Sequence, residues 1–280
     1  MIKCELPKGD DPLQQIEECL RIIEEMDKSY EKREETVLDL SEVKWILPCS
    51  ALLLSGKIFE IKNKGIEINY IEPKKEDVKK YLKDIGFPLG TERDGETFSP
   101  IKHFGNEKDI NEEISKLLSS MENKIPENFG SSIPYILGEL ADNIEQHSKF
   151  SNASLMAQYY PQKNYVDIGV LDDGLTIPFV FEINKIGFSK DSEAINKALS
   201  GITTKGEELS RGYGLKSSKE IVEKALNGEM YIISRKGALI INPDSEIKHY
   251  DFKNTYLKGT LVYMRLKSPD KHLNIYPYLE

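Results

Sequence analysis

The chain has 280 residues, of which 39% are hydrophobic and 9% aromatic. This composition excludes a chain that is disordered throughout, and the length allows one large or two modest domains. Lys and Arg number 38 against 47 Asp and Glu, which gives a net charge of -9. Such a chain is not expected to bind nucleic acid or anionic lipid through its bulk charge.

The N-terminus and the apolar stretches indicate the compartment. The chain reaches Asp10 and Asp11 without an apolar core, so no signal peptide is expected. The longest apolar stretch, WILPCSALLLSG, is too short to span a bilayer and contains Pro48. The cysteines show neither metal-ligand spacing nor an even disulfide set, and the histidines are scattered. We therefore expect a cytoplasmic protein that is not bound to a membrane.

The first part of the chain alternates between helical and strand patterns. Apolar residues recur at helical spacing from Asp11 to about Glu35, with Pro12 in the first turn. The segments TVLDL and GIEINYI are predicted strands, Ala51–Lys62 a helix between them, and EDVKKYLKDIGF a second helix. This order predicts a small sheet with helices packed on it.

Residues 1–88 resemble the STAS domain, the fold of anti-sigma-factor antagonists. The resemblance rests on VLDLSEVKWI, on the apolar helix after it and on the ending YLKDIGF. Regulatory members of that family carry an acidic residue and a phosphorylatable serine between the strand and the helix. Here the place reads Leu47, Pro48, Cys49, Ser50, without the acid. We therefore expect Ser50 to cap the helix, not to act as a phosphorylation switch.

The next segment, LGTERDGETFSPIKHFGN, is rich in glycine, proline and polar residues and shows neither the helical nor the strand periodicity. That texture is typical of a connector. We expect a STAS-like regulatory domain over 1–88, a linker over 89–105, a second domain over 106–268 and a tail over 269–280. Within the second domain, one helix is expected from Asn106 to Lys124 and another from near Ser131 or Ser132.

The second of these helices carries an ordered set of polar residues in ELADNIEQHS, residues 139–148. Its apolar residues fall on one stripe, which predicts a face that packs on a core. Glu139, Asn143 and His147 recur every four residues along the edge of that stripe, where a cleft could form. Asn143 could contact a metal or a phosphate, and Glu139 could hold a water as general base. Taken alone, the pattern fits a solvated helix face equally well.

A second candidate lies in YVDIGVLDDGLTIP. The apolar residues of this segment alternate, so Asp172 is predicted to share their inward face and Asp173 to lie on the other. A buried carboxylate needs a hydrogen-bond donor, and a purine amino group would serve. Gly174 lets the backbone pass close to a ligand. A plain Asp-Gly turn is the alternative.

The third candidate is SRGYGLKSSKEIVEKALNG. A helix is expected to begin just after Gly212 and Gly214 and to end at Asn227 and Gly228. Free amides at a helix N-terminus that follows glycines form an anion site. The segment matches neither the Walker pattern nor the Rossmann pattern.

In order and spacing, these segments resemble the nucleotide-binding boxes of the GHKL superfamily of ATPases, over about residues 105–268. This superfamily contains gyrase, heat-shock protein 90, sensor histidine kinases and anti-sigma serine kinases. Four boxes match: ELxxN followed by His or Tyr at Glu139, Leu140, Asn143 and His147; DxGxG at Asp172 and Gly174, with Thr176 in place of a glycine; GxGL at Gly212, Gly214 and Leu215; and GT at Gly259 and Thr260.

The resemblance implies a Bergerat-type α/β sandwich that binds ATP with Mg²⁺. It implies that Asn143 coordinates Mg²⁺, that Asp172 binds the adenine amino group, that Thr260 supports this contact through water, and that Glu139 is the general base. The segment Pro178–Arg211 would form the ATP lid.

The lid holds the sequence GITTKGEELSRG, in which Gly201, Gly206 and Gly212 would permit movement. Lys205 and Arg211 could neutralise phosphate charge, and Thr204 is a further candidate contact to the nucleotide. Solvated loop charge explains Lys205 and Arg211 equally well.

The predicted architecture is therefore an α/β two-domain protein of the α+β kind. An autophosphorylating histidine kinase is not expected, because His103 lies in the predicted connector and His249 and His272 follow the boxes. Two functions fit. The first is ATP hydrolysis or phosphoryl transfer to a protein Ser or Thr, with Glu139 as base. The second is an ATP-gated switch that binds a protein with little turnover. Both imply ATP or ADP and a protein partner, and the STAS-like domain could dock or dimerise in either.

Overall fold

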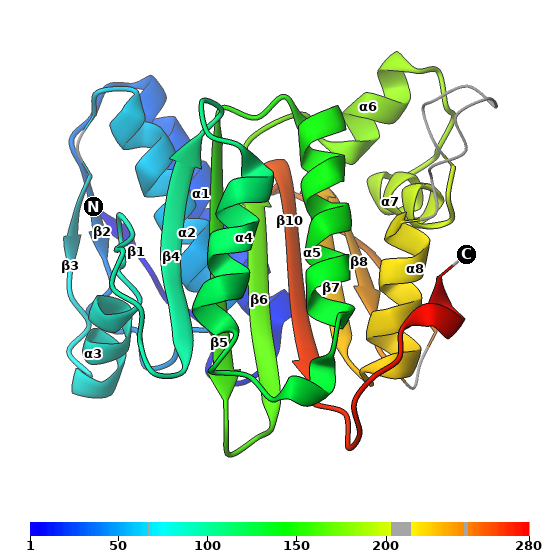
Figure 1. The fold of residues 1–280 in the computed structure, drawn as a ribbon. Coiled ribbons are helices and arrows are strands. Elements are labelled where there is room, and N and C mark those ends of the chain that lie inside the picture. Colours follow the sequence, from blue (N-terminus) through cyan, green and yellow to red (C-terminus); the bar gives the residue numbers. More distant parts are fainter. Residues whose placement is uncertain (67, 203–213, 244–245, 280) are drawn as a thin grey trace.

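The strands form two sheets (Figure 1). The computed structural model describes all residues except 67, 203–213, 244–245 and 280. A three-stranded parallel sheet has the order β1-β2-β3. A seven-stranded sheet has the order β4-β5-β6-β10-β7-β8-β9, and its strand pairs are antiparallel. The chain is thus a mixed α/β protein with one parallel and one antiparallel sheet.

The N-terminal segment follows the order of elements that the sequence predicts. The helix expected from Asp11 is α1, the helix expected over Ala51–Lys62 is α2, and the two predicted strands are β2 and β3. The bounds are β1 Ile2–Lys3, α1 Pro12–Glu31, β2 Thr36–Asp39, α2 Pro48–Asn63, β3 Ile68–Ile71 and α3 Glu76–Asp84.

Helix α2 begins earlier than expected. Leu47 is its N-cap and Pro48 lies in its first turn, as proline prefers. Ser50 is therefore inside the helix, where it is fully buried and its Oγ donates to Gln15 Oε1 (2.8 Å). The prediction that Ser50 caps the helix is wrong, because Pro48 already starts it.

The rest of the described chain forms the seven-stranded sheet and the helices α4 to α8. The helix expected from Asn106 is α4, and the helix that carries Glu139 begins at Ser132. The bounds are β4 Phe98–Gly105, α4 Ile110–Met121, α5 Ser132–Asn143, β5 Asn152–Tyr160, β6 Tyr165–Asp172, α6 Ile177–Ile183, α7 Asp191–Leu199, α8 Gly214–Glu220, β7 Glu229–Arg235, β8 Gly237–Ile241, β9 Lys248–Asp251 and β10 Leu257–Lys267.

Strand β4 lies in the segment 89–105, which was expected to be a linker. Its register with β5 shifts between Ser99 and Lys102, which indicates a β-bulge. Ser99, Pro100 and Ile101 are buried one after another, so the strand lacks the alternation by which a sequence reveals strands. The last eight residues of the expected linker are therefore part of the sheet.

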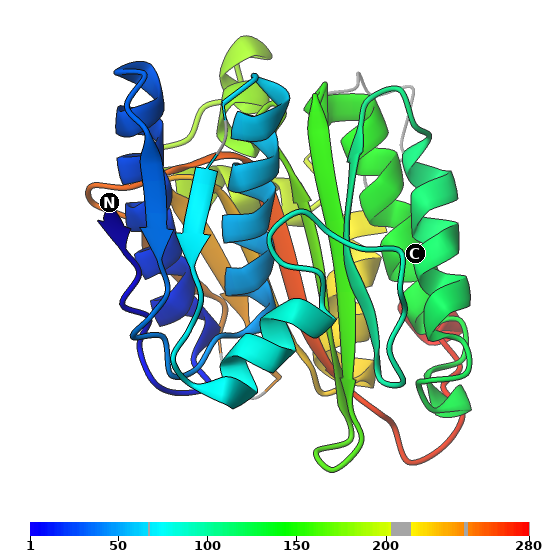
Figure 2. The ribbon, with the colours of Figure 1, turned by 90° about the vertical axis from the view of Figure 1, so that its left-hand side faces the viewer.

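Helices cover both faces of the seven-stranded sheet (Figures 1 and 2). On one face, residues of α1 and α2 share a buried cluster with sheet residues such as Leu171 and Tyr263. On the other face, residues of α4 and α5 share a second cluster with sheet residues such as Val170 and Met264. Because the first cluster contains residues from both, the N-terminal segment and the sheet share one continuous core.

Two glycines let α2 lie directly on β6. A Cβ added to Gly56 of α2 would lie 2.6 Å from Leu171 Cδ2, and a Cβ added to Gly169 of β6 would lie 2.6 Å from Leu52 Cδ2. Both distances are far below a normal carbon–carbon contact, and both leucine side chains are buried or nearly so. Side chains at these positions would clash with the two leucines, so either the leucines or the helix would have to move.

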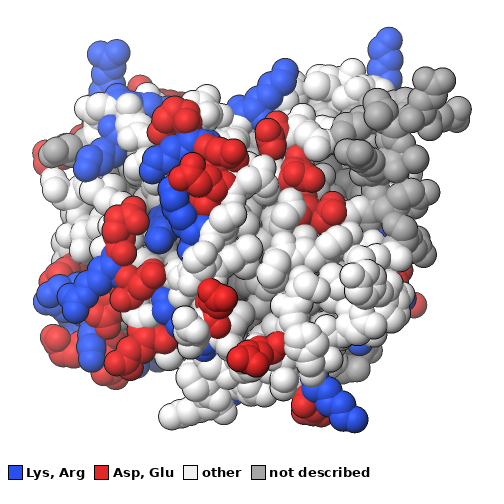
Figure 3. Space-filling view, in the orientation of Figure 1, with Lys and Arg blue, Asp and Glu red and all other residues white. Residues whose placement is uncertain are grey.

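Charges of both signs mark the surface over the N-terminal elements (Figure 3). The described Lys and Arg residues lie among Asp and Glu there, whereas a group of Asp and Glu side chains lies over the upper end of α5 and the area below this group is mainly uncharged. On this face the described basic residues make no continuous area of the kind that binds polyanions. Within the described ranges, no helix has the length and apolar character needed to cross a bilayer.

His103 of β4 joins α2 to the sheet through two serines. Its Nε2 lies 2.8 Å from Ser55 Oγ, its Nδ1 lies 2.7 Å from Ser154 Oγ, and its ring stacks on Phe59. Ser55 donates its proton to Pro88 O (2.5 Å), so Ser55 accepts from Nε2–H and Ser154 donates to Nδ1. Burial lowers the pKa of His103 to about 4. His103 is thus held neutral between α2, β4 and β5.

Protonation of His103 is expected to destabilise the fold in mildly acidic solution. The pKa is 6.5 in the unfolded chain and about 4 in the folded one, so the unfolded state takes up the proton first as the pH falls. The free energy of unfolding should decrease between pH 6.5 and 4, by at most about 3 kcal/mol. Chemical denaturation at several pH values measures this, and His103→Gln should flatten that part of the profile. An unchanged profile in the variant would contradict the role given to His103.

Candidate functional site

Helix α5 places Glu139 and Asn143 beside its buried face as the sequence predicted, whereas the third residue of the predicted edge, His147, lies beyond its end in a π-helix. Its apolar residues Ile133, Ile136, Leu137 and Leu140 are buried. Glu139 and Asn143 are only partly exposed, whereas the neighbouring Asp142 is exposed. The side chain of Asn143 donates from Nδ2 to Glu139 O (2.6 Å), which leaves its Oδ1 as the acceptor for a ligand.

The first and third sequence boxes meet at Glu139. Helix α8 begins at Gly214, and a Cβ added to Gly214 would lie 1.5 Å from Glu139 Oε2. A glycine at this position therefore leaves the room that the carboxylate occupies. Burial raises the pKa of Glu139, the negative charge of Asp142 adds to this, and a hydrogen bond from Tyr135 opposes it. Glu139 is thus a stronger base than an exposed glutamate.

Asp172 ends β6 as a buried carboxylate. It is 2% exposed, and burial raises its pKa to about 6 despite its hydrogen bonds. The Ser148 hydroxyl and the Gly174 amide (2.9 Å) both donate to the same oxygen, Oδ1. Within the part of the chain that the structure describes, Oδ2 receives no such bond. The predicted inward orientation of Asp172 is confirmed, and one of its oxygens is left for a further donor.

A row of polar side chains continues from Asp172 across the sheet. Thr260 of β10 pairs with Asp172, and Ser234 of β7 pairs with Thr260 on its other side. Residues paired in this way point to the same face. The hydroxyls of Ser234 and Thr260 lie 2.9 Å apart, and Ser234 Oγ also accepts from Ile177 N (2.9 Å). The row therefore ends at the first residue of α6.

Two glycines allow the segments around Asp172 to converge. A Cβ on Gly174 would lie 2.0 Å from Ser148 Oγ and 2.2 Å from Ser148 O. Gly259 has a φ of +92°, and its Cβ would lie 1.9 Å from Asp172 O. Because the obstacles include backbone oxygens, neither position can take a side chain without moving the chain.

Ser148 was not among the predicted site residues, although it ends the segment ELADNIEQHS. The predicted edge followed a four-residue spacing, which leads from Asn143 to His147. In the structure α5 continues as a π-helix over Ile144–Ser148, whose turn is one residue wider. This turn brings Ser148 to Asp172. Ser234 was also missed, although its even position in EMYIISR is the same signal of inward parity that singled out Asp172.

The remaining predicted residues are placed as follows. Leu215 is partly buried and packs against the second core cluster. Thr176, which replaces a glycine of the DxGxG pattern, is the N-cap of α6, and its Oγ1 accepts from Phe179 N (3.3 Å). The expected lid contains α6 and α7. Thr204, Lys205, Arg211 and Gly212 lie outside the described residues.

Two comparisons with known proteins were negative. Neither a scan against protein-family models nor a search of curated proteins found a match for this chain.

Removal of the buried charge at Asp172 is expected to stabilise the fold at neutral pH. The pKa is raised from 3.8 in the unfolded chain to about 6, so the stability of the wild-type protein falls as the pH rises from about 4 to 6. Asp172→Asn keeps an oxygen for Ser148 and Gly174 but never ionises. Its free energy of unfolding should exceed that of the wild type by at most about 3 kcal/mol at pH 7, with the difference shrinking toward pH 4. A difference independent of pH would contradict this account.

Proposed function

We propose that residues 106–268 form a GHKL-type domain that binds ATP with Mg²⁺, and that residues 1–88 form a STAS-like regulatory domain. The observation that carries the proposal is the buried Asp172 carboxylate, whose Oδ1 takes two protein donors while Oδ2 is left for a ligand. Burying an ionised group is costly unless each oxygen finds a donor. The exocyclic amino group of adenine is a donor of the right kind, and Thr260 stands beside Asp172 on the same face.

The residues around Asp172 suit a bound nucleotide and its metal. Gly174, Gly214 and Gly259 let Ser148, the Glu139 carboxylate and the Asp172 backbone approach closely, and so bring the residues of the proposed site together. Asn143 Oδ1 would hold Mg²⁺, because its amide nitrogen is already used by Glu139 O. The ion would neutralise the negative charge of the phosphates.

For the reaction, we propose ATP hydrolysis or transfer of a phosphoryl group to a protein Ser or Thr hydroxyl. Glu139 would accept the proton from the attacking water or hydroxyl. Two features support this role: burial raises the pKa of Glu139, and Gly214 leaves room at its carboxylate. Nothing in the proposal requires nucleic acid or a membrane.

A second function, an ATP-gated switch that binds a protein with little turnover, is supported by α6. This helix begins three residues after Gly174, and Ser234 holds its first amide. It exposes Phe179 (43%) and Ile183 (55%), four residues apart and so on one side of the helix. A ligand beside Asp172 could shift α6 and change how this apolar side is presented to a partner protein.

The binding proposal is tested with Asp172→Asn. The wild type should bind MgADP measurably in calorimetry, whereas the variant should bind at least about 10-fold more weakly, because a side chain that donates from Nδ2 faces the amino group of adenine. Asp84→Asn, which removes an exposed carboxylate of α3, is the matched control and should bind as the wild type does. If the wild type binds neither MgADP nor MgATP, the proposed function is wrong.

Glu139→Gln separates the enzyme from the switch. Loss of a general base should reduce phosphate release by about 100-fold or more while the affinity for MgADP changes little. Glu145→Gln, an exposed carboxylate in the π-helix, is the control. A wild type that binds MgATP tightly but releases phosphate no faster than the uncatalysed background would exclude hydrolysis. Incubation with labelled ATP and candidate partners would then show whether label is transferred or a complex forms.

A further inference from the structure

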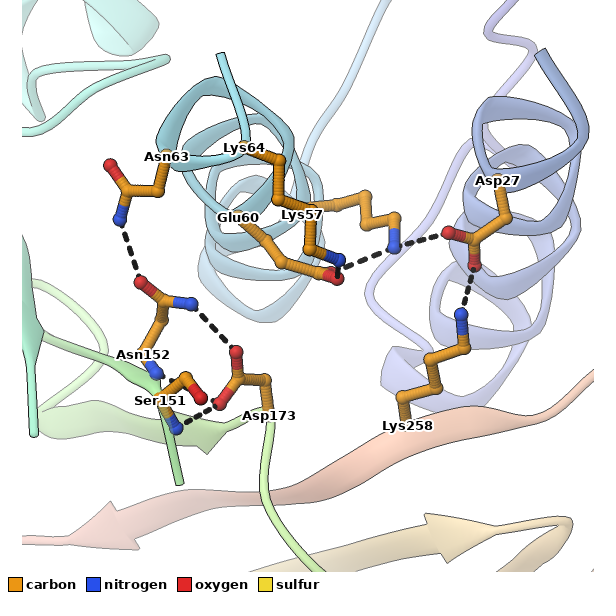
Figure 4. Close-up of polar contacts among 9 residues, drawn as sticks. All are labelled: Asp27, Lys57, Glu60, Asn63, Lys64, Ser151, Asn152, Asp173 and Lys258. Carbon is orange, nitrogen blue, oxygen red and sulfur yellow. Dashed lines mark hydrogen bonds and ion pairs between the residues drawn. The ribbon is translucent and has the colours of Figure 1, made fainter. Parts of the chain in front are cut away.

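A chain of side-chain hydrogen bonds links the end of α2 to the residue next to Asp172 (Figure 4). Asn63, the last residue of α2, donates from Nδ2 to Asn152 Oδ1 (2.7 Å). Asn152 in turn donates from its own Nδ2 to Asp173 Oδ2 (2.7 Å). We call Asn63, Asn152 and Asp173 the α2 arm. It runs on the face of the sheet opposite to Asp172, because consecutive residues of a strand point to opposite faces.

Asp173 also fixes the backbone at the start of β5. Its Oδ1 accepts from Ser151 N (2.7 Å) and from Asn152 N (2.8 Å), and its own amide donates to Asn152 O (3.1 Å). These bonds join the end of β6 to the segment that follows Ser148. Ser148 O accepts in addition from Leu175 N (2.5 Å). The contacts of Asp173 on the other face therefore help to fix the distance between Asp172 and its partner Ser148, together with the pairing of β5 with β6.

A second set of ion pairs ties the N-terminal helices to the start of β10 (Figure 4). Asp27 of α1 lies 2.5 Å from Lys57 Nζ of α2 and 3.5 Å from Lys258 Nζ of β10. Lys57 is paired again with Glu60 (2.7 Å), and its side chain is only 5% exposed, so the pair is shielded from solvent. Lys258 immediately precedes Gly259 and Thr260. The N-terminal helices thus hold both strand ends that carry the candidate adenine contacts.

From this geometry we propose that Asn63 is a positioning residue for the nucleotide site, and that α2 thereby sets the affinity for nucleotide from the opposite face of the sheet. The inference rests on the proposed function, since it assigns a regulatory input to the same site. The N-terminal segment and the nucleotide are then coupled: a partner that displaces the end of α2 lowers nucleotide affinity, and bound nucleotide opposes that displacement to the same degree.

Asn63 offers a clean test because it is exposed. Substitution of an exposed helix-end residue normally has little effect on folding, so a change in binding can be separated from a loss of structure. Lys62, the exposed residue before it, provides the matched control. In calorimetry, Asn63→Ala should bind MgADP about 3- to 10-fold more weakly than the wild type, while Lys62→Ala should match the wild type. The melting temperatures of both nucleotide-free variants should stay close to that of the wild type.

A double-mutant cycle shows whether Asn63 acts through the α2 arm. In a background of Asn152→Ala the arm is already broken, so adding Asn63→Ala should produce no further loss of affinity. Wild-type affinity in Asn63→Ala would overturn the inference and leave the proposed function standing. Additive losses in the double variant would also overturn it, because Asn63 would then act by another route.

Hydrogen exchange in the nucleotide-free protein tests positioning without any ligand. The Gly174 amide is protected by its bond to Asp172, and Asn63→Ala should accelerate exchange at Gly174 and Leu175 relative to Lys62→Ala. Unchanged exchange would overturn the positioning role. If the wild type fails to bind nucleotide, the proposed function is wrong and the affinity part of the inference fails with it, whereas faster exchange would still support the structural link from α2 to the Asp172 loop.

Discussion

The direct packing of α2 on β6 is the contact on which the other features of the molecule depend. Gly56 and Gly169 remove the side chains that would hold the helix and the strand apart, so Leu52 and Leu171 can fill the space between them. This contact buries one face of the seven-stranded sheet under the N-terminal helices, while α4 and α5 bury the other. A sheet covered on both sides has no free face, so changes in the N-terminal segment reach the strands directly.

The same sheet carries a buried charge at a cost in stability. Asp172 is held at the end of β6 by Ser148 and Gly174, and burial raises its pKa toward neutrality. Its immediate neighbour Asp173 is surrounded by backbone amides instead. Two adjacent carboxylates thus have opposite tasks. Asp173 stabilises the turn of the chain, whereas Asp172 is destabilising until a donor reaches its second oxygen, which is typical of a residue kept for binding.

How much could be predicted from sequence depended on whether the local geometry was regular. The inward orientation of Asp172 followed from the alternation in β6, and the placement of Glu139 and Asn143 on one edge of α5 followed from their four-residue spacing. Ser148 escaped because a π-helix adds a residue to the turn, and β4 escaped because a bulge buries three consecutive residues. The prediction that Ser50 caps α2 was wrong because a proline starts the helix two residues earlier. Contacts between segments distant in sequence, such as Asn63 with Asn152, leave no periodic pattern and need the structure.

The two carboxylates at the end of β6 also restrict how this chain can change. Side chains alternate between the faces of a strand, so inserting or deleting a single residue within β6 would exchange the faces of Asp172 and Asp173. Asp172 would then face α2 and lose Ser148, and Asp173 would face α5 and lose Asn152. Substitutions along β6 preserve this division, but a change in its length does not. We therefore expect the spacing of β6, more than the identity of its apolar residues, to be fixed among proteins that share this site.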